Sequence, residues 1–153
     1  MELKKYFILI IILSFTSSIY ANIIKPSKNL TAYDVIKIQL NALKKNNKPN
    51  KNSGIKQTWI FAHPENKKNT GPYERFQKML LGDQYNILLN HKSHKIKLII
   101  NSKNKYIYGV ELISINKKMY FYEWHLEKST IKDCNNCWFT TIVSQPTNKG
   151  NVI

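Results

Sequence analysis

Arginine is nearly absent from this chain: Arg75 stands alone among 24 basic residues, and only nine residues are acidic. A formal net charge of +15 would ordinarily suggest nucleic acid or an anionic membrane as a partner. Arginine, however, is the residue preferred for bidentate contacts to phosphate and guanine, and lysine supplies the charge here. A genome of low GC content explains the same excess of lysine, asparagine and isoleucine. We therefore expect no nucleic-acid partner and keep a lysine-driven binder of envelope polyanions as an alternative.

Long apolar runs are also scarce, and the single one lies at the N-terminus, where Tyr6–Phe15 is almost entirely Ile, Leu and Phe. Lys4 and Lys5 precede it, and small residues lead to a cleavage point after Ala21. This is the layout of a secretory signal peptide. The run is shorter than the roughly 20 apolar residues that span a bilayer. We expect residues 1–21 to be removed and the rest to be exported, periplasmic or secreted, without a stable membrane span; an uncleaved anchor is the alternative.

Cysteine occurs only twice, as Cys134 and Cys137. In an oxidising compartment such a pair forms a disulfide more often than it stays as free thiols. A redox Cys-x-x-Cys site normally lies at a helix N-terminus, whereas here a β-branched and aromatic run, residues 138–143, follows. We expect a disulfide that pins a turn, with unpaired thiols as the alternative. A zinc site lacks a second ligand pair at useful spacing.

Helical periodicity predicts three helices in the first half of the chain, at residues 32–45, 53–63 and 72–81. The first carries one apolar stripe, and Thr31 with Asp34 forms an approximate capping box at its start. Pro64 stops the second helix, and Pro72 suits the first turn of the third because its missing N–H is not needed there. We expect residues 65–70 to be a polar connector.

After residue 83 the pattern changes to short runs rich in Ile, Tyr, Phe, Thr and Val. These predict strands at residues 84–89, 95–100, 105–114, 118–128 and 137–144. In the fourth run Trp124 and His125 fall on opposite faces because side chains alternate along a strand. Helices followed by four or five antiparallel strands indicate an α+β domain. We expect a polar N-terminal segment, one such domain and a flexible tail, at residues 22–29, 30–146 and 147–153.

The block from Gln57 to His94 contains three short motifs. They read Gln-Thr-Trp-Ile-Phe-Ala-His-Pro-Glu-Asn, then Thr-Gly-Pro-Tyr-Glu-Arg-Phe, then Tyr-Asn-Ile-Leu-Leu-Asn-His-Lys-Ser-His. The block resembles an uncharacterised bacterial and plant family catalogued as domain of unknown function 4864, over about residues 30–146. The resemblance implies a fold similar to the nuclear-transport-factor-2-like cone, in which helices pack on a curled antiparallel sheet. That family has no established activity, so the resemblance implies no catalytic residue.

Residues that could carry catalysis or a metal are few. His125 lies between two glutamates on a polar strand face, where a carboxylate could orient it as a base; a solvated strand face is the simpler interpretation. His91 and His94 have a metal-ligand spacing, but Lys92 and Lys95 would repel a cation. Gly-rich phosphate loops and Gly-x-Ser-x-Gly elbows are absent from the sequence. We assign no catalytic residue, no metal and no cofactor.

A ligand pocket is better supported, since a curled sheet can leave an aromatic-lined cavity beneath its helices. Arg75, retained in so lysine-rich a chain, suggests a planar fork that lysine cannot mimic, bound either to an acidic ligand or, structurally, to Glu65, Glu74 or buried carbonyls. The candidate pocket residues are Trp59, His63, Tyr73, Arg75, Trp124 and His125.

The leading hypothesis is therefore an exported, non-enzymatic domain that binds a small molecule or a partner protein. The alternatives are a hydrolase- or isomerase-like enzyme of the cone fold, with His125 or His63 as base, and the polyanion binder. A homodimer through the exposed sheet face is compatible with the sequence.

Overall fold

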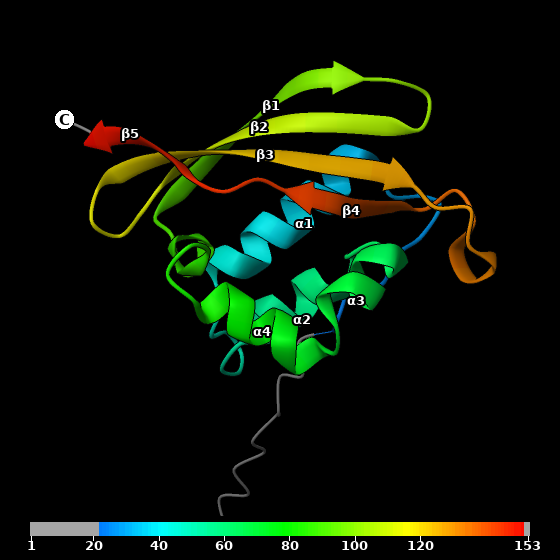
Figure 1. Ribbon diagram of the computed structural model, residues 1–153, viewed down its shortest axis with the longest axis horizontal. Coiled ribbons are helices and arrows are strands. Elements are labelled where there is room, and N and C mark those ends of the chain that lie inside the picture. The colour runs from blue at the N-terminus through cyan, green and yellow to red at the C-terminus, as the bar shows by residue number, and fades with distance from the viewer. Residues whose placement is uncertain (1–21, 152–153) are drawn as a thin grey trace, which may run out of the picture.

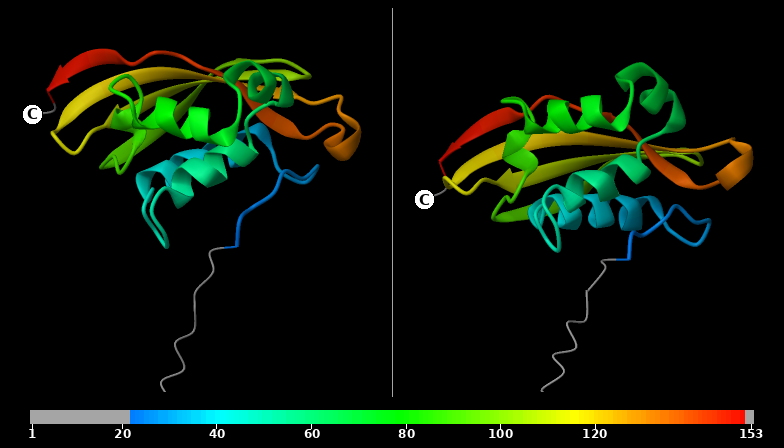
Figure 2. Two further views of the ribbon diagram at one scale, coloured as in Figure 1. Left: turned by 60° about the horizontal axis from the view of Figure 1, so that its bottom comes forward. Right: turned by 90° about the horizontal axis from the view of Figure 1, so that it is seen from below.

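The structure is a computed structural model that describes residues 22–151 (Figure 1). Within this range four α-helices lie on one side of a curved, open antiparallel sheet of five strands, as Figure 2 shows. The predicted α+β class is thus confirmed, and the arrangement is compatible with a cone-like fold. The expected signal peptide, residues 1–21, lies outside the described residues. None of the helices in residues 22–151 combines the length and the apolar character needed to cross a membrane.

The helices are α1 (Ala32–Lys44), α2 (Ser53–Ile60), α3 (Pro64–Thr70) and α4 (Tyr73–Leu81). The predicted capping box of α1 is present, because the Thr31 hydroxyl accepts from the Asp34 N–H and the Asp34 carboxylate accepts from the Thr31 N–H. α1 and α2 approach so closely that a Cβ on Gly54 would overlap the carbonyl of Ala42. Glycine at this position therefore sets the distance between the two helices.

The third helix, α3, replaces the polar connector expected at residues 65–70. Pro64 occupies its first turn, and His63 Nδ1 accepts the Glu65 N–H at 3.2 Å. Glu65 lies in the first turn and Lys67 and Lys68 in the last, which complements the helix dipole. The expectation was wrong because these terminal signals, and not an apolar stripe, make the helix.

The polar segment before α1 is fastened to α2. Gln57 Oε1 accepts the Ile24 N–H at 2.8 Å, and Gln57 Nε2 donates to the Ile24 carbonyl at 2.8 Å. This pair of bonds resembles one rung of a β-ladder. Residue 24 is therefore held against the helical layer.

The strands are β1 (Ser93–Asn101), β2 (Lys105–Ile113), β3 (Lys118–Lys128), β4 (Trp138–Val143) and β5 (Thr147–Asn151). Neighbours pair in the order β1-β2-β3-β4, and β5 also pairs with β3. β4 pairs with the second half of β3, from Trp124 onward, while β5 pairs with the first half, up to Phe121 (Figure 1). β4 and β5 therefore share one edge of the long central strand.

Two sequence expectations in the second half were wrong. Residues 84–89 form a turn and a 3₁₀ helix, Asn86–Leu88, instead of a strand, and Leu88 is buried against the helical core. The Asn90 N–H then donates to the carbonyl of Leu43 at the end of α1. Residues 147–151 form β5 where a flexible tail was expected, because β3 extends past β4 and offers unpaired backbone groups.

The core lies between α1 and the inner face of the sheet. From the helix side it contains Val35, Ile36, Leu40 and Leu43, all at most 1% exposed. From the sheet side it contains Tyr108, Val110, Leu112, Tyr122, Trp124 and Leu126. α1 contacts β3 and β4 in this core, while α2 packs on α1 and α4.

Candidate functional site

A cavity of about 300 Å³, the inner pocket, lies between the helices and the inner face of the sheet. Its volume is at the lower end of the range for small-molecule sites. Every lining residue is uncharged, although the protein carries a formal charge of +15. The lining residues are Gln39, Leu43, Thr58, Asn66, Thr70, Phe76, Met79, Leu80, Tyr85, Leu88, Trp124 and residues 140–143.

A cluster of buried polar groups forms one wall of the inner pocket. The Trp124 indole N–H lies 3.1 Å from Gln39 Oε1 and 3.1 Å from Thr140 Oγ1. The Thr140 hydroxyl donates to Gln39 Oε1 at 2.6 Å, and Gln39 Nε2 donates to the carbonyl of Thr58 at 3.2 Å. Gln39 and Trp124 are each 1% exposed. Burying such groups is tolerated because each has a partner.

Four separate elements bring this cluster together. Gln39 lies on the buried face of α1, Trp124 on β3 and Thr140 on β4, while Thr58 belongs to α2. Sequence reasoning proposed Trp124 and missed Gln39 and Thr140. A usable signal was present for Gln39, since a polar residue at position 39 interrupts the apolar stripe of the first helix.

The rim of the inner pocket is also polar but uncharged. The Tyr85 hydroxyl donates to the Val143 carbonyl at 3.3 Å, and the Asn66 amide donates to the carbonyls of Thr140 and Thr141. Burial raises the pKa of Tyr85, so its phenol stays protonated. The pocket therefore remains neutral throughout the physiological pH range.

Trp59 of α2 and Tyr73 of α4, both proposed as pocket residues, instead pack against each other outside the inner pocket. The Trp59 ring lies 4.9 Å from that of Phe76 and 6.2 Å from that of Tyr73. Lys67 Nζ covers the Trp59 ring at 5.4 Å and donates to the Ile60 carbonyl at 3.3 Å. Burial lowers the pKa of Lys67. This cluster joins α2, α3 and α4, and of its aromatic members only Phe76 lines the inner pocket.

His63 and Arg75 do not line the inner pocket either. His63 accepts the Glu65 N–H as described above, and its ring meets the Phe139 ring edge-on at 6.1 Å. Arg75 is exposed on α4, and among the ion pairs found within residues 22–151 none includes it. The ion pair with Glu65 or Glu74 that the sequence suggested is therefore not formed.

His125 lies on the face of the sheet opposite the inner pocket. Its Nε2 is 3.3 Å from Glu123 Oε2, so the pairing with a carboxylate that the sequence suggested exists. Trp124, the preceding residue, points into the pocket, and consecutive side chains of a strand point to opposite faces. The structure therefore separates His125 from Trp124 instead of bringing the two together.

His91 and His94 form a hydrogen-bonded pair at the start of β1. His91 Nδ1 lies 2.7 Å from the Leu88 carbonyl, so it carries a proton, and His91 Nε2 then accepts from His94 Nδ1 at 2.7 Å. Burial lowers the pKa of His91 to about 4, assisted by His94 and Lys44 and opposed by the bond to Leu88. Within the described part of the chain no third ligand joins them in a metal-binding cluster.

Cys134 and Cys137 are joined in a disulfide, with their Cα atoms 5.5 Å apart. The bridge closes the loop between β3 and β4, next to the 3₁₀ turn Lys132–Cys134. It lies at the far end of the sheet from the turn between β2 and β3 (Figure 1).

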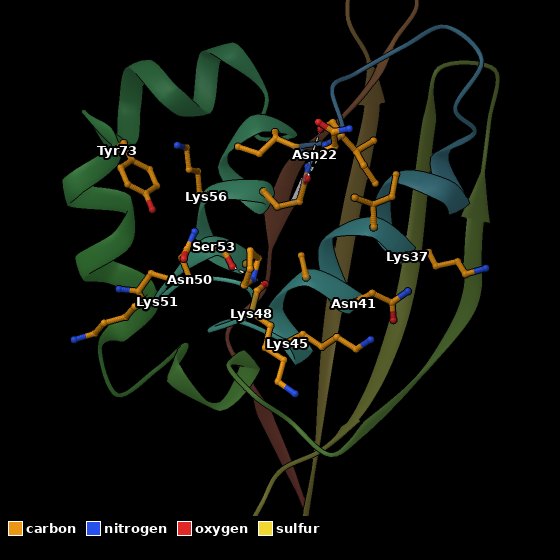
Figure 3. A pocket seen from close by; sticks show the side chains of 18 of the residues that line it. Asn22, Lys37, Asn41, Lys45, Lys48, Asn50, Lys51, Ser53, Lys56 and Tyr73 are labelled. Atoms are coloured by element: carbon orange, nitrogen blue, oxygen red, sulfur yellow. Dashed lines mark hydrogen bonds between the residues drawn. The ribbon is translucent and has the colours of Figure 1, made fainter. Parts of the chain in front are cut away.

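A larger open hollow of about 820 Å³ lies beside α1 and α2 (Figure 3). Its lining includes five lysines and Tyr73. In Figure 3 the ammonium groups of Lys37, Lys48 and Lys51 point in different directions, away from one another. They do not converge on one anion, so this hollow is a weaker candidate than the inner pocket.

No family model matches the sequence, and no curated protein and no solved structure is significantly similar to it. What the protein binds must therefore be inferred from the residues of the inner pocket themselves.

Proposed function

We propose that the protein is an exported domain that holds a small, neutral and largely apolar molecule in the inner pocket, without transforming it. The observation that carries this proposal is a wall of uncharged residues around the buried Gln39–Thr140–Trp124 cluster. A charged ligand would lose its hydration there without gaining an ion pair. A neutral ligand loses much less.

The polar cluster would orient the ligand. Gln39 Nε2 has two hydrogens, and one of them is used on the Thr58 carbonyl. The Thr140 oxygen donates one bond and accepts one, which leaves a second lone pair. A ligand with one carbonyl or hydroxyl group could therefore bond to this wall while its apolar body contacts Phe76, Met79 and Leu80.

The absence of catalysis is supported by the place of the titratable groups. His125 and Glu123 lie on the opposite face of the sheet, and His63 caps α3. A general base must come within hydrogen-bond reach of the proton that it removes. Neither histidine meets this condition for a molecule in the inner pocket.

Two dyes that share a ring system test the proposal. N-phenyl-1-naphthylamine is neutral, and 8-anilinonaphthalene-1-sulfonate adds one sulfonate to the same skeleton. We expect the neutral dye to bind more tightly, by about tenfold or more, because the sulfonate would be desolvated without a partner. The affinities are measured by fluorescence titration.

A matched pair of variants assigns the dye to the inner pocket. Met79→Trp should fill the pocket and abolish tight binding of the neutral dye. Leu81→Trp, on the same helix but outside the pocket lining, should leave that binding unchanged. Equal affinity for the two dyes, or tight binding that survives Met79→Trp, would contradict the proposal.

Export is tested on the protein produced from its full sequence in a secreting host. Intact-mass analysis should find a chain that begins at Asn22. Retention of residues 1–21 in the mature protein would favour the membrane-anchored alternative.

A further inference from the structure

An open groove of about 790 Å³ lies at the end of the sheet, where the β1–β2 turn, the β3–β4 loop and the segment leading into α1 meet (Figure 1). We call it the end groove. It shares no lining residue with the inner pocket, so it is a separate site. Its lining consists of residues 28–33, Ser102, Lys103, Tyr106, Tyr108, Lys128, Asn136 and Trp138.

Four aromatic rings form a continuous wall of the end groove. Tyr106 stacks on Tyr108 with ring centres 6.0 Å apart and meets Trp138 edge-on at 5.0 Å. Tyr33, at the start of α1, lies 6.2 Å from Tyr108. Tyr108 and Trp138 are buried and hold the wall in place, while Tyr33 is 47% exposed. The rings that a ligand could contact are therefore those of Tyr33 and Tyr106, which pack against this buried pair.

The charged residues that line the end groove are all positive: Lys28, Lys103 and Lys128. Lys128 Nζ lies 5.3 Å from the centre of the Trp138 ring, so its charge is placed directly at the aromatic wall. The acidic residue of the adjoining helix turn, Asp34, is engaged by the N–H and hydroxyl of Thr31. The groove is thus complementary to an anion.

The uncharged polar groups and the ring angles narrow the class of anion. Asn29, Asn136 and Ser102 add amide and hydroxyl groups that can both donate and accept hydrogen bonds. The planes of Tyr33 and Tyr108 are inclined by 57°, so one flat base could not stack on both. Successive sugar rings, which are not coplanar and carry many hydroxyls, can follow such a surface.

We propose that the end groove binds an acidic oligosaccharide, with sugar rings against Tyr33 and Tyr106 and carboxylate or sulfate groups paired with Lys28, Lys103 and Lys128. This site is independent of the neutral ligand of the inner pocket. Failure of either proposal leaves the other standing, because the two sites share no residue.

Isothermal titration calorimetry on the protein without residues 1–21 tests the proposal with four probes. Two are acidic, hexagalacturonate and a heparin-derived hexasaccharide, and at least one should bind with a Kd below about 1 mM. Fully methyl-esterified hexagalacturonate retains the rings without the charge, and inorganic polyphosphate retains charge without the rings. Both should bind more weakly than the acidic sugar, and the affinity for the sugar should fall as salt is added.

Variants separate a built site from general attraction to a cationic protein. Tyr33→Ala should weaken sugar binding about three- to tenfold, whereas Leu81→Ala, which removes an equally exposed side chain from α4, should not. Lys28→Gln with Lys103→Gln should weaken it about fivefold, and Lys56→Gln with Lys78→Gln should have less effect despite the same change in charge.

Three results would overturn the proposal. They are Kd values above 1 mM for both acidic sugars, equal affinity for the methyl ester, and equal losses in the end-groove and control variants. A fourth result, polyphosphate that binds as tightly as the sugar, would overturn it too, because charge alone would then be recognised.

Discussion

A single buried glutamine determines the character of the inner pocket. Gln39 lies among apolar neighbours on α1, where an unpaired amide would cost free energy, yet it bonds to Thr58, Thr140 and Trp124. These bonds fix the Trp124 ring between α1 and the sheet. Side-chain networks of this kind become unfavourable when one member is removed. Gln39 thus links the α1–β4 contact to the polar wall that a ligand would meet.

His91 should make the protein less stable in mild acid. Burial lowers its folded-state pKa to about 4 from an ordinary value of 6.5, so the unfolded chain binds this proton more tightly. The part of the stability that depends on neutral His91 is therefore fully present above pH 6.5 and is lost as the pH falls toward 4. We expect a decrease of about 2 kcal/mol in the free energy of unfolding between pH 7 and pH 4.5, measured by urea denaturation.

Two variants distinguish this effect from general acid denaturation. His91→Gln should lower stability at pH 7 and flatten the dependence between pH 7 and pH 4.5. Leu88→Val, which destabilises the same region without changing a titratable group, should keep the wild-type slope. A slope that is unchanged in His91→Gln would show that other groups are responsible.

At the scale of elements, the edge of β3 depends on β5. β5 pairs with Lys118–Phe121, beyond the reach of β4. Ending the chain after Pro146 should lower the melting temperature and promote aggregation, because the backbone and apolar side chains of this part of β3 become an open edge. Calorimetry and light scattering would measure both effects.

The control keeps the strand and changes one exposed side chain. Thr147→Ala retains the backbone that pairs with Phe121 and should behave as the wild type. If the truncated chain were as stable and as soluble as this control, β5 would contribute nothing to the fold.

Sequence periodicity identified the elements whose own residues specify them. The apolar stripe and capping box of α1 and the alternation in β3 are local patterns, so both were predicted. α3 carries no apolar stripe, and the apolar residues at 87–89 suggest a strand although they pack as a 3₁₀ turn. β5 reads Thr-Asn-Lys-Gly-Asn and is a strand only because β3 leaves an edge free.

The inner pocket was harder to predict than the elements around it. Trp124 was proposed because it is a large aromatic residue on the apolar face of a strand. Gln39 and Thr140 lie 101 positions apart, and their bond exists only once α1 crosses β4. Trp59, His63, Tyr73, Arg75 and His125 have the side chains expected of a site, but the structure places them elsewhere.

At the scale of the whole molecule, the excess of lysine should lower the free energy of unfolding. Ion pairs between lysine and carboxylate within residues 22–151 are few and exposed, such as Lys68–Glu65 and Lys105–Glu127. Repulsion among the other lysines opposes the compact state. We expect the melting temperature to rise between 10 mM and about 150 mM NaCl, because salt screens this repulsion.

A charge-reduced protein provides the comparison for this prediction. Replacement of the exposed lysines Lys51, Lys78 and Lys97 by glutamine should raise the melting temperature at 10 mM NaCl and reduce the response to salt. A melting temperature that does not respond to salt in either protein would mean that repulsion among the lysines does not measurably lower the stability.

The two hydrogen bonds between Gln57 and Ile24 bear on when the proposed leader could be removed. Ile24 lies three positions after Ala21, the residue before the proposed cleavage point, and both of its backbone groups are occupied by the glutamine amide. A peptidase needs several extended, unengaged residues on each side of the bond that it cuts. If the chain is exported and cut after Ala21 as proposed, cleavage would be easier before α2 has formed and bound Ile24.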